Sequence, residues 1–339
     1  KSKKPSLSVR FNGILKPEVS GDYDFEIFSI GPSRLFIDDE ELIDNWSSQE
    51  PGDTFFSMGS KPKRGLITLE SGKEYSIKVE YKWEGRFPAV QIGMLAPDDH
   101  DLMDAAVALA QKSDATILIV GTNSDWETEG NDRDSLQLPL RQNELIEKVC
   151  TANKNTVVVL NTGAPCEMPW NDQVDAILQC WFPGQEFGNS LADIIFGDVN
   201  PSGKLPTTFP VKLEDTPAYS TYPGKDLQMD YQEGLYIGYR WYEKEKIVPL
   251  YPFGHGLSYT TFDYSNVRAI PPKGTSSVAA FELEITNTGS TEGKEVIQCY
   301  SSVQNSKVDR PLKELKKFQK INLDTGESKK ITFEVNERD

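Results

Sequence analysis

The stretch DLMDAAVALAQKSDATILIV, residues 101–120, marks a change of pattern along the chain. Residues 101–113 have apolar side chains at helical spacing, and ATILIV, residues 115–120, is an uninterrupted apolar run typical of a buried strand. The following segments continue the alternation: LRQNELIEKVC (140–150, helix), NTVVVLN (155–161, strand), VDAILQCW (174–181, strand) and EFGNSLADIIFG (186–197, helix). Helices alternating with uniformly apolar strands predict a parallel sheet covered on both faces.

On both sides of this region, apolar and polar residues alternate with a period of two. Examples are DYDFEIF (22–28) and EYSIKVEY (74–81) upstream, and EVIQCY (295–300) and KKITFEV (329–335) downstream. Short alternating strands between turn residues predict β-sandwiches, the second of immunoglobulin or fibronectin type. We therefore expect a multidomain protein with a β-sandwich (1–97), an α/β sandwich domain (98–215), an aromatic-rich connector (216–261) and a second β-sandwich (262–339).

The composition excludes several classes of partner. The chain of 339 residues carries 52 acidic and 36 basic residues, a net charge of −16. Nucleic acids and anionic membranes require an excess of Lys and Arg, so neither is expected as a partner. No apolar run is long enough to span a bilayer, and the first residues show no signal peptide. We expect a soluble protein and leave open whether it is cytoplasmic or secreted.

Few residues are available for metal or nucleophilic chemistry. The four cysteines (Cys150, Cys166, Cys180 and Cys299) have no C-x-x-C spacing, which favours buried free thiols over a disulfide. Two histidines argue against a His-based zinc site and a Ser-His-Asp triad. One glycosylation sequon begins at Asn45 and is weak evidence of secretion. We expect no metal and no cofactor.

An acidic loop, WETEGNDRDSLQLP (126–139), follows the strand at 115–120. Open parallel sheets bind ligands outside the carboxyl ends of their strands, where this loop lies. Crowded carboxylates raise each other's pKa, which suits a general acid. Arg133 can neutralise one of them, and Trp126 can pack on a sugar face. Composition alone nevertheless favours an ordinary solvated loop. The acids between the end of the strand and Pro139, within residues 121–139, are Asp125, Glu127, Glu129, Asp132 and Asp134.

The spacing of Glu127 and Glu129 could bring their two carboxylates close together, but it could not place them on opposite sides of a sugar. In an extended segment the two side chains would share one face. Glycosidases need two carboxyls that flank the scissile bond, about 5–5.5 Å apart for retention or about 6.5–9.5 Å for inversion. Two acids on one face approach a sugar from the same side, so we expect the partner acid to come from elsewhere.

Two features of the first sandwich offer alternative binding sites. Asp38 and Asp39 can bind calcium through their carboxylates, although an exposed hairpin turn is the favoured interpretation. Phe55 and Phe56 lie in a Gly/Pro-rich loop, where an exposed aromatic pair can stack on a sugar ring. Alternation can equally place one of these two phenylalanines in the core.

Several long motifs resemble the C-terminal half of glycoside hydrolase family 3 β-glucosidases. They occur in the order expected for that family and extend to residue 339. The first sandwich is similar to the protective-antigen-type sandwich inserted in a subset of these enzymes, and the last domain to a fibronectin III-like sandwich. The motifs are TEGNDRDSLQLP, NTVVVLNTGAPCEMPW, CWFPGQEFGNSLADIIFGDVNPSGKLPTTFP, YQEGLYIGYRWYE, PFGHGLSYTTF and GKEVIQCY…RPLKELKKFQKINLDTGE.

The resemblance implies a retaining hydrolysis of terminal β-D-glucosyl residues without metal or cofactor. In the family, an aspartate on an N-terminal TIM barrel attacks the anomeric carbon, and a glutamate of the α/β domain serves as acid/base. Aligned on the EG-DR pattern, that glutamate is Glu129, with Glu127 as second choice. Asp132 and Arg133 would order the loop. Trp126 and a stacking aromatic at Phe55 or Phe56 would contact substrate, because the inserted sandwich narrows the aglycone side.

The sequence also departs from the family pattern. No TIM barrel precedes the first sandwich, which lacks its opening strands, and the last sandwich stops short of its usual last strands. We therefore expect the nucleophile on an N-terminal portion, in the same polypeptide or a separate chain, and no turnover by this chain alone. A homodimer is left open. The alternative is a lectin-like carbohydrate-binding module without catalysis.

Overall fold

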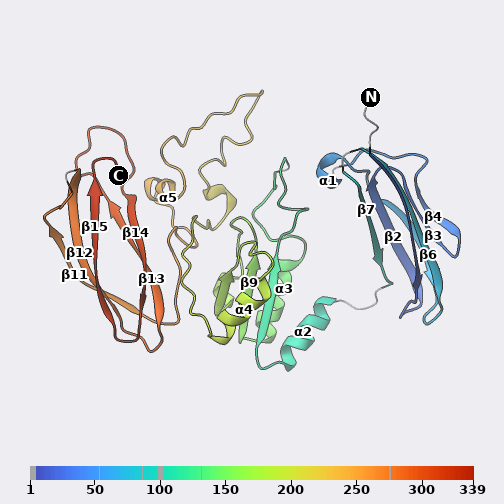
Figure 1. Ribbon diagram of the computed structural model, residues 1–339, viewed down its shortest axis with the longest axis horizontal. Coiled ribbons are helices and arrows are strands. Elements are labelled where there is room, and N and C mark those ends of the chain that lie inside the picture. The colour runs from blue at the N-terminus through green and yellow to red at the C-terminus, as the bar shows by residue number, and fades with distance from the viewer. Residues whose placement is uncertain (1–4, 53, 86, 98–101, 131, 275) are drawn as a thin grey trace. The chain divides into compact units, whose positions relative to one another are not determined.

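The computed structural model describes residues 5–339 except 53, 86, 98–101, 131 and 275, and it leaves out the side chain of Phe56. The chain forms two compact units, 1–106 and 107–339, each of which is treated separately below (Figure 1). The boundary between them falls within helix α2 (Leu102–Lys112). The predicted boundary at 97/98 adjoins residues outside the described ones, and the four predicted domain ranges stay predictions.

The first unit is a sandwich of two antiparallel sheets. One sheet has the strand order β1-β6-β3-β4 and the other β5-β2-β7. A short helix, α1 (Thr54–Ser57), precedes β5. The strands are β1 (Ser6–Leu15), β2 (Gly21–Ile30), β3 (Ser33–Ile37), β4 (Glu40–Asn45), β5 (Lys63–Leu69), β6 (Tyr75–Glu84) and β7 (Ala89–Leu95).

The alternation seen in the sequence builds the core of this sandwich. In β2, Tyr23, Phe25 and Ile27 are at most 2% exposed, whereas the acids between them lie on the outer face. In β6, Tyr75 and Val79 are buried in the same way. Both predicted strands are confirmed, because a half-buried strand needs apolar side chains on one face only.

Asp38 and Asp39 form the turn between β3 and β4. Both have positive φ angles, 48° and 63°, as the tight turns of two-residue hairpins require. The Asp38 carboxylate accepts a hydrogen bond from the backbone N–H of Ser76 at 2.7 Å, and Asp39 pairs with Lys78 at 2.7 Å. The hairpin interpretation of this pair is therefore confirmed, and its carboxylates hold the turn.

The sequon asparagine is buried between the two sheets. Asn45 is 0% exposed, and its amide nitrogen donates to the hydroxyls of Ser29, Ser33 and Ser60 at 3.0–3.1 Å. A glycan on this nitrogen would displace all three contacts. The folded unit therefore offers no glycosylation site at Asn45, and the sequon carries no information about secretion.

The second unit begins with a parallel sheet of strand order β10-β9-β8. Its strands are β8 (Thr116–Gly121), β9 (Thr156–Asn161) and β10 (Ala176–Gln179), and its helices are α2, α3 (Gln142–Ala152) and α4 (Phe187–Phe196). The predicted strands and helices of this region are confirmed within a few residues. The central strand β9 is nearly fully buried, with Val158, Val159 and Leu160 at 0% exposure.

The prediction that this sheet is covered on both faces is wrong for β8. Ile117 and Ile119 point to one face of the strand and are 47% and 53% exposed, whereas Val120 on the other face is buried. β8 is also the edge strand, so it lacks a strand neighbour on one side within the described residues. The apolar composition of β8 correctly predicted a strand of the parallel sheet. It could not predict that one face of this edge strand is left exposed.

The unit ends in a second sandwich, reached through a largely irregular connector. Sheets β11-β12-β15 and β13-β14 enclose a core that includes Ile285, Ile297 and Leu323. The connector contains the short helix α5 (Tyr239–Glu245), which the sequence analysis missed, and a 3-10 turn at Leu213–Asp215 precedes it. Another 3-10 turn, Asn171–Gln173, lies between β9 and β10. The strands are β11 (Phe262–Ile270), β12 (Ser277–Asn287), β13 (Gly293–Ser301), β14 (Glu314–Leu323) and β15 (Ser328–Asn336).

The four cysteines are free thiols, as predicted. Cys150 and Cys166 are buried, and burial raises the pKa of the Cys166 thiol to about 12. This thiol is therefore protonated at neutral pH and packs as a small apolar side chain. Within the described residues, no helix has both the length and the apolar character needed to cross a membrane.

His255 makes the stability of the second unit depend on pH. Its ring stacks on Tyr251, with centroids 5.1 Å apart, and burial together with the nearby Lys204 lowers its pKa below the usual 6.5. The unfolded chain then binds a proton at higher pH than the folded one, so stability is complete above about pH 6.5 and falls as the pH drops below it. We expect His255→Gln to reduce the loss of Tm between pH 7 and pH 5, measured by differential scanning calorimetry. An unchanged pH slope would contradict this assignment.

Candidate active site

The acidic loop leaves the sheet at the carboxyl end of β8, beside the end of β9. The backbone N–H of Thr122 donates to the carbonyl of Asn161 at 3.1 Å, which extends the pairing of the two strands by one residue. The chain then turns at Asn123, whose carbonyl accepts the N–H groups of Trp126 and Glu127 at 3.1 and 2.9 Å. The loop therefore starts from a fixed point on the sheet.

Glu127 is the anchor of this loop. Its Oε1 accepts a hydrogen bond from the Thr122 hydroxyl at 2.5 Å and one from the Gly163 N–H at 3.1 Å. Arg133 Nη1 lies 3.8 Å from the same oxygen, and both side chains are about 15% exposed (14% and 16%). The carboxylate thus joins the ends of β8 and β9 through two charge-assisted hydrogen bonds, and it forms an ion pair with the arginine of the loop.

Arg133 extends this link to the second half of the loop. Its Nη2 donates to the carbonyl of Gln137 at 3.2 Å, and the neighbouring carbonyl of Leu136 accepts the N–H of Glu167 at 2.8 Å. Arg133 therefore contacts the loop on both sides, as an ordering residue would. Asp132 is exposed.

Glu129 lies two residues beyond the anchor and is exposed. The backbone bends at Glu127 and turns at Glu129 and Gly130, so these residues do not form the extended strand considered for the pair. The two carboxylates differ in environment, because Glu127 accepts two hydrogen bonds and lies 3.8 Å from a guanidinium nitrogen of Arg133, whereas Glu129 is exposed.

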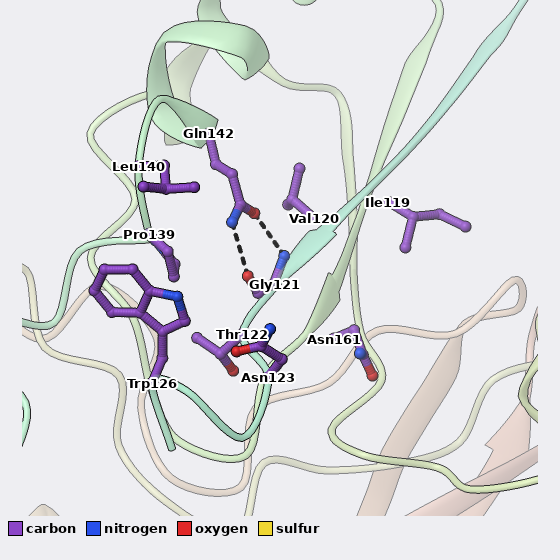
Figure 2. Close-up of a pocket in the computed structure, with 10 residues that line it drawn as sticks. All are labelled: Ile119, Val120, Gly121, Thr122, Asn123, Trp126, Pro139, Leu140, Gln142 and Asn161. Carbon is purple, nitrogen blue, oxygen red and sulfur yellow. Dashed lines mark hydrogen bonds between the residues drawn. The ribbon is translucent and has the colours of Figure 1, made fainter. Parts of the chain in front are cut away.

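A pocket of about 420 Å³ adjoins the start of the loop. Figure 2 shows Trp126 and Pro139 on one side of Gly121, and the amide of Gln142 bonded to the Gly121 backbone through both of its polar atoms. These bonds are 2.7 Å from the Gly121 N–H to Gln142 Oε1 and 2.8 Å from Gln142 Nε2 to the Gly121 carbonyl. Trp126 is 42% exposed and can offer a ring face to a ligand.

The other predicted binding residues lie in the first unit. Phe55 is half-buried and packs against Phe28, with ring centroids 5.4 Å apart, so part of its ring belongs to the packing of the sandwich. The side chain of Phe56 lies outside the described residues. Within the described part of the chain, no group of three or more His, Cys, Asp or Glu side chains could hold a metal ion.

The sequence analysis missed three members of this site. Thr122 and Gly163 follow the ends of β8 and β9, and Gln142 opens α3. A signal existed for Gly163, since a glycine just past a buried strand often marks a close approach. A Cβ at this position would lie 2.4 Å from Glu127 Oε2 and 2.6 Å from the Phe182 ring.

Gly163→Ala should therefore push the Glu127 anchor out of place. Overpacking at a closely packed site costs about 1–3 kcal/mol, so we expect a lower Tm in thermal unfolding. Gly188→Ala is the matched control, because a Cβ in α4 meets nothing within 4 Å and alanine is the better helix former. Equal Tm values for the two variants would contradict the contact with Glu127.

Comparison with known proteins places this geometry in a family. The glycosyl hydrolase family 3 C-terminal domain matches residues 43–259, and a fibronectin type III-like domain matches residues 295–339. The chain is 40% identical to a β-glucosidase of Kluyveromyces marxianus over 99% of its own length and 41% of that protein. It is 37% identical to a probable β-glucosidase I of Aspergillus terreus, covering 97% of the chain and 42% of the relative.

Solved structures give the same result. The K. marxianus β-glucosidase in complex with glucose superposes with a TM-score of 0.88 at 39% identity, over 99% of this chain and 40% of that one. A β-glucosidase of Streptomyces venezuelae, in complex with D-glucose, gives a TM-score of 0.71 at 31% identity, over 99% and 42%. The chain spans about two fifths of the length of these relatives. It therefore belongs to glycosyl hydrolase family 3, and it corresponds to the C-terminal part of β-glucosidases of that family.

Proposed function

We propose that this chain supplies the acid/base, Glu129, of a retaining β-glucosidase that hydrolyses terminal non-reducing β-D-glucosyl residues. The observation that carries the proposal is an exposed carboxylate on a loop anchored at the carboxyl ends of two parallel strands. In this mechanism the Glu129 carboxylic acid protonates the leaving oxygen, and its carboxylate then removes a proton from the water that releases glucose.

The hydrogen bonds of the loop favour Glu129 over Glu127. A group that gives and takes a proton in each cycle must reach the substrate oxygen within about 2.6–3.2 Å. Glu127 Oε1 already faces the Thr122 hydroxyl, the Gly163 N–H and Arg133, and moving it would release the loop. Glu129 makes no hydrogen bond or ion pair with the described residues. The neighbouring Gly130 has a positive φ of 85°, a backbone conformation that glycine adopts readily.

The remaining predicted residues take supporting roles in this proposal. Arg133 and Asp132 order the loop, and Trp126 offers an exposed ring at its start. Phe55 and Phe56 contribute a stacking surface on the aglycone side. No metal or organic cofactor enters this mechanism, and a homodimer stays a prediction.

The nucleophilic aspartate in this proposal comes from an N-terminal TIM-barrel portion, either in the same polypeptide or in a separate chain. The support is the length of the relatives, of which this chain matches about two fifths. A retaining glycosidase needs both carboxyls, so one of them alone gives no covalent intermediate.

Hydrolysis of p-nitrophenyl β-glucoside tests this proposal. We expect no turnover by the 339-residue chain alone, and turnover once the chain is assembled with the N-terminal portion that its relatives carry. The same chain with Glu129→Gln is the control for contaminating activity. Turnover by the chain alone that disappears in Glu129→Gln would contradict the division of the two carboxyls between portions.

The alternative of a lectin-like module gains no support from the contacts of its candidate residues. Asp38 and Asp39 are engaged with Ser76 and Lys78, and Phe55 packs on Phe28. Sugar binding by this chain that is lost with EDTA and unaffected by substitutions in the acidic loop would favour that alternative.

A further inference from the structure

The acidic loop begins and ends at one place on the sheet. Gly121 is the last residue of β8, and Gln142, 21 positions later in the chain, is the first residue of α3. The Gln142 amide joins the two residues. Its Oε1 accepts the Gly121 N–H at 2.7 Å, and its Nε2 donates to the Gly121 carbonyl at 2.8 Å (Figure 2). We call Gly121 and Gln142 the neck of the loop.

The neck pairs backbone groups at the edge of the sheet. β8 has β9 on one side and no strand among the described residues on the other. The N–H of Thr122 donates to Asn161 at the end of β9, whereas both polar backbone groups of Gly121 bond to Gln142. The amide thus satisfies the donor and the acceptor of Gly121 as a neighbouring strand would, and leaving such groups unpaired is costly.

The neck needs a side chain that both donates and accepts. A neutral amide carries a donor and an acceptor side by side, whereas a carboxylate carries acceptors alone. Every described residue that lines the pocket with Gln142 is uncharged. The charged residues nearest to Gln142 in the sequence, Arg141 and Glu144, pair with each other at 2.8 Å. The two bonds at Gly121 therefore depend on the Gln142 amide itself.

The neck also determines where the loop starts. Thr122 follows Gly121 directly and donates its hydroxyl to Glu127, and Glu129 lies two residues further on. At the other end of the loop, Leu140 has a positive φ of 55° and is 86% exposed, so its side chain adds little packing beside α3. A shift at the neck would therefore move the first residues of the loop with it.

We propose that Gln142 is a positioning residue for Glu129, because its amide fixes both ends of the loop that carries this carboxyl. The inference rests on the proposed function, in which Glu129 is the acid/base. A general acid must come within about 2.6–3.2 Å of the oxygen that it protonates, and a small misplacement of a reacting group lowers the rate strongly. A loosened neck should therefore slow the proton transfers of Glu129.

The pH profile of Gln142→Glu tests this role in the enzyme assembled with the N-terminal portion that its relatives carry. The ionised carboxyl has no proton to donate to the Gly121 carbonyl, so at pH 7 we expect kcat for an alkyl glucoside to fall about 10–100-fold. The protonated carboxyl can both accept the N–H and donate to the carbonyl. The ratio of variant to wild-type kcat should therefore rise as the pH falls toward about 4.3, the ordinary pKa of a glutamate.

Two further variants complete this test. Gln142→Met offers neither a strong donor nor a strong acceptor, so its loss of kcat relative to the wild type should be the same at every pH. Gln173→Glu is the matched control, because Gln173 is exposed and its side chain makes no hydrogen bond with the described residues. This control should follow the wild type at every pH. A pH-independent ratio for Gln142→Glu, or wild-type rates for Gln142→Met, would overturn the proposal.

A double-variant cycle separates positioning of Glu129 from general support of the fold. If Gln142 acts through Glu129, adding Gln142→Glu to Glu129→Gln should lower kcat by no more than about twofold at pH 7, since no acid/base is left to position. Full multiplication of the two losses would overturn the positioning role and leave the proposed function intact. Wild-type rates for Glu129→Gln alone would instead overturn the proposed function, and this inference with it.

Discussion

Glu129→Gln in the assembled enzyme is expected to lower kcat for glucosides with poor leaving groups by roughly 10²–10⁴-fold, the range of general acid–base catalysis. Glutamine keeps the size of the side chain but can neither donate the proton to the leaving oxygen nor take one from water. Because Glu129 is exposed and makes no hydrogen bond or ion pair with the described residues, the variant should keep its Tm. Steady-state kinetics with an alkyl glucoside or cellobiose checks this result.

Comparing substrates with different leaving groups distinguishes loss of the general acid from general damage to the enzyme. A p-nitrophenolate departs without protonation, so glycosylation with the aryl substrate should be affected less than with an alkyl glucoside. Azide can then replace the base-activated water and restore turnover as glucosyl azide. Asp134→Asn is the matched control, since Asp134 is another exposed acid of the loop, and it should leave both substrates unaffected.

Glu127→Gln distinguishes the second choice from the first. It weakens the link between Thr122, Gly163 and Arg133, so we expect reduced activity on both substrate types and a lower Tm, without rescue by azide. Rescue of Glu127→Gln by azide, together with normal rates for Glu129→Gln, would move the acid/base assignment to Glu127.

The strands were predictable wherever burial follows a local pattern. The alternation in β2 and β6 placed Tyr23, Phe25 and Val79 in the core, and the apolar run of β9 identified an internal strand. In these segments each residue's environment is set by its own face of the strand, so a short window of sequence is enough. Short elements such as α5 were missed because their boundaries depend on packing with distant segments.

The place of the acidic loop was predictable, but its internal contacts were not. The rule that ligands bind at the carboxyl ends of parallel strands predicts a site there, and the structure places the loop at the carboxyl end of β8. Nothing local in the sequence indicates that Glu127 reaches Gly163, which is 36 residues away, or that this contact separates its role from that of Glu129. Charge composition alone treats the two carboxylates as equivalent, and only the fold makes them different.

The second large effect is expected at a buried ion pair that joins the α/β region to the C-terminal sandwich. Lys204 Nζ donates to the carbonyl of Gly256 at 2.6 Å and lies 3.2 Å from Glu295 Oε1 on β13. Tyr264 on β11 donates its hydroxyl to the same carboxylate at 3.1 Å, and burial, together with this carboxylate, raises the pKa of Tyr264. The side chains of Lys204 and Glu295 are only 16% and 11% exposed.

Lys204→Met should destabilise the second unit by about 3–5 kcal/mol, because it leaves the Glu295 carboxylate buried without its cation. For a unit of this size the loss corresponds to a fall in Tm of roughly 6–20 °C. The matched control is Lys329→Met, whose pair with Glu327 is 3.0 Å long but lies at the surface, with exposures of 43% and 35%. An exposed pair contributes about 1 kcal/mol or less, so this control should barely change Tm.

The double variant Lys204→Met, Glu295→Leu decides between a lost ion pair and lost packing. If the cost of Lys204→Met comes from an uncompensated charge, removing the Glu295 carboxylate as well should recover much of the stability, since apolar replacements of buried pairs are often neutral. If the two substitutions instead add their costs, the contact between the regions depends on the shape of the lysine side chain, and the electrostatic account is wrong. A fall in Tm no larger than that of Lys329→Met would show that water already screens the Lys204–Glu295 pair.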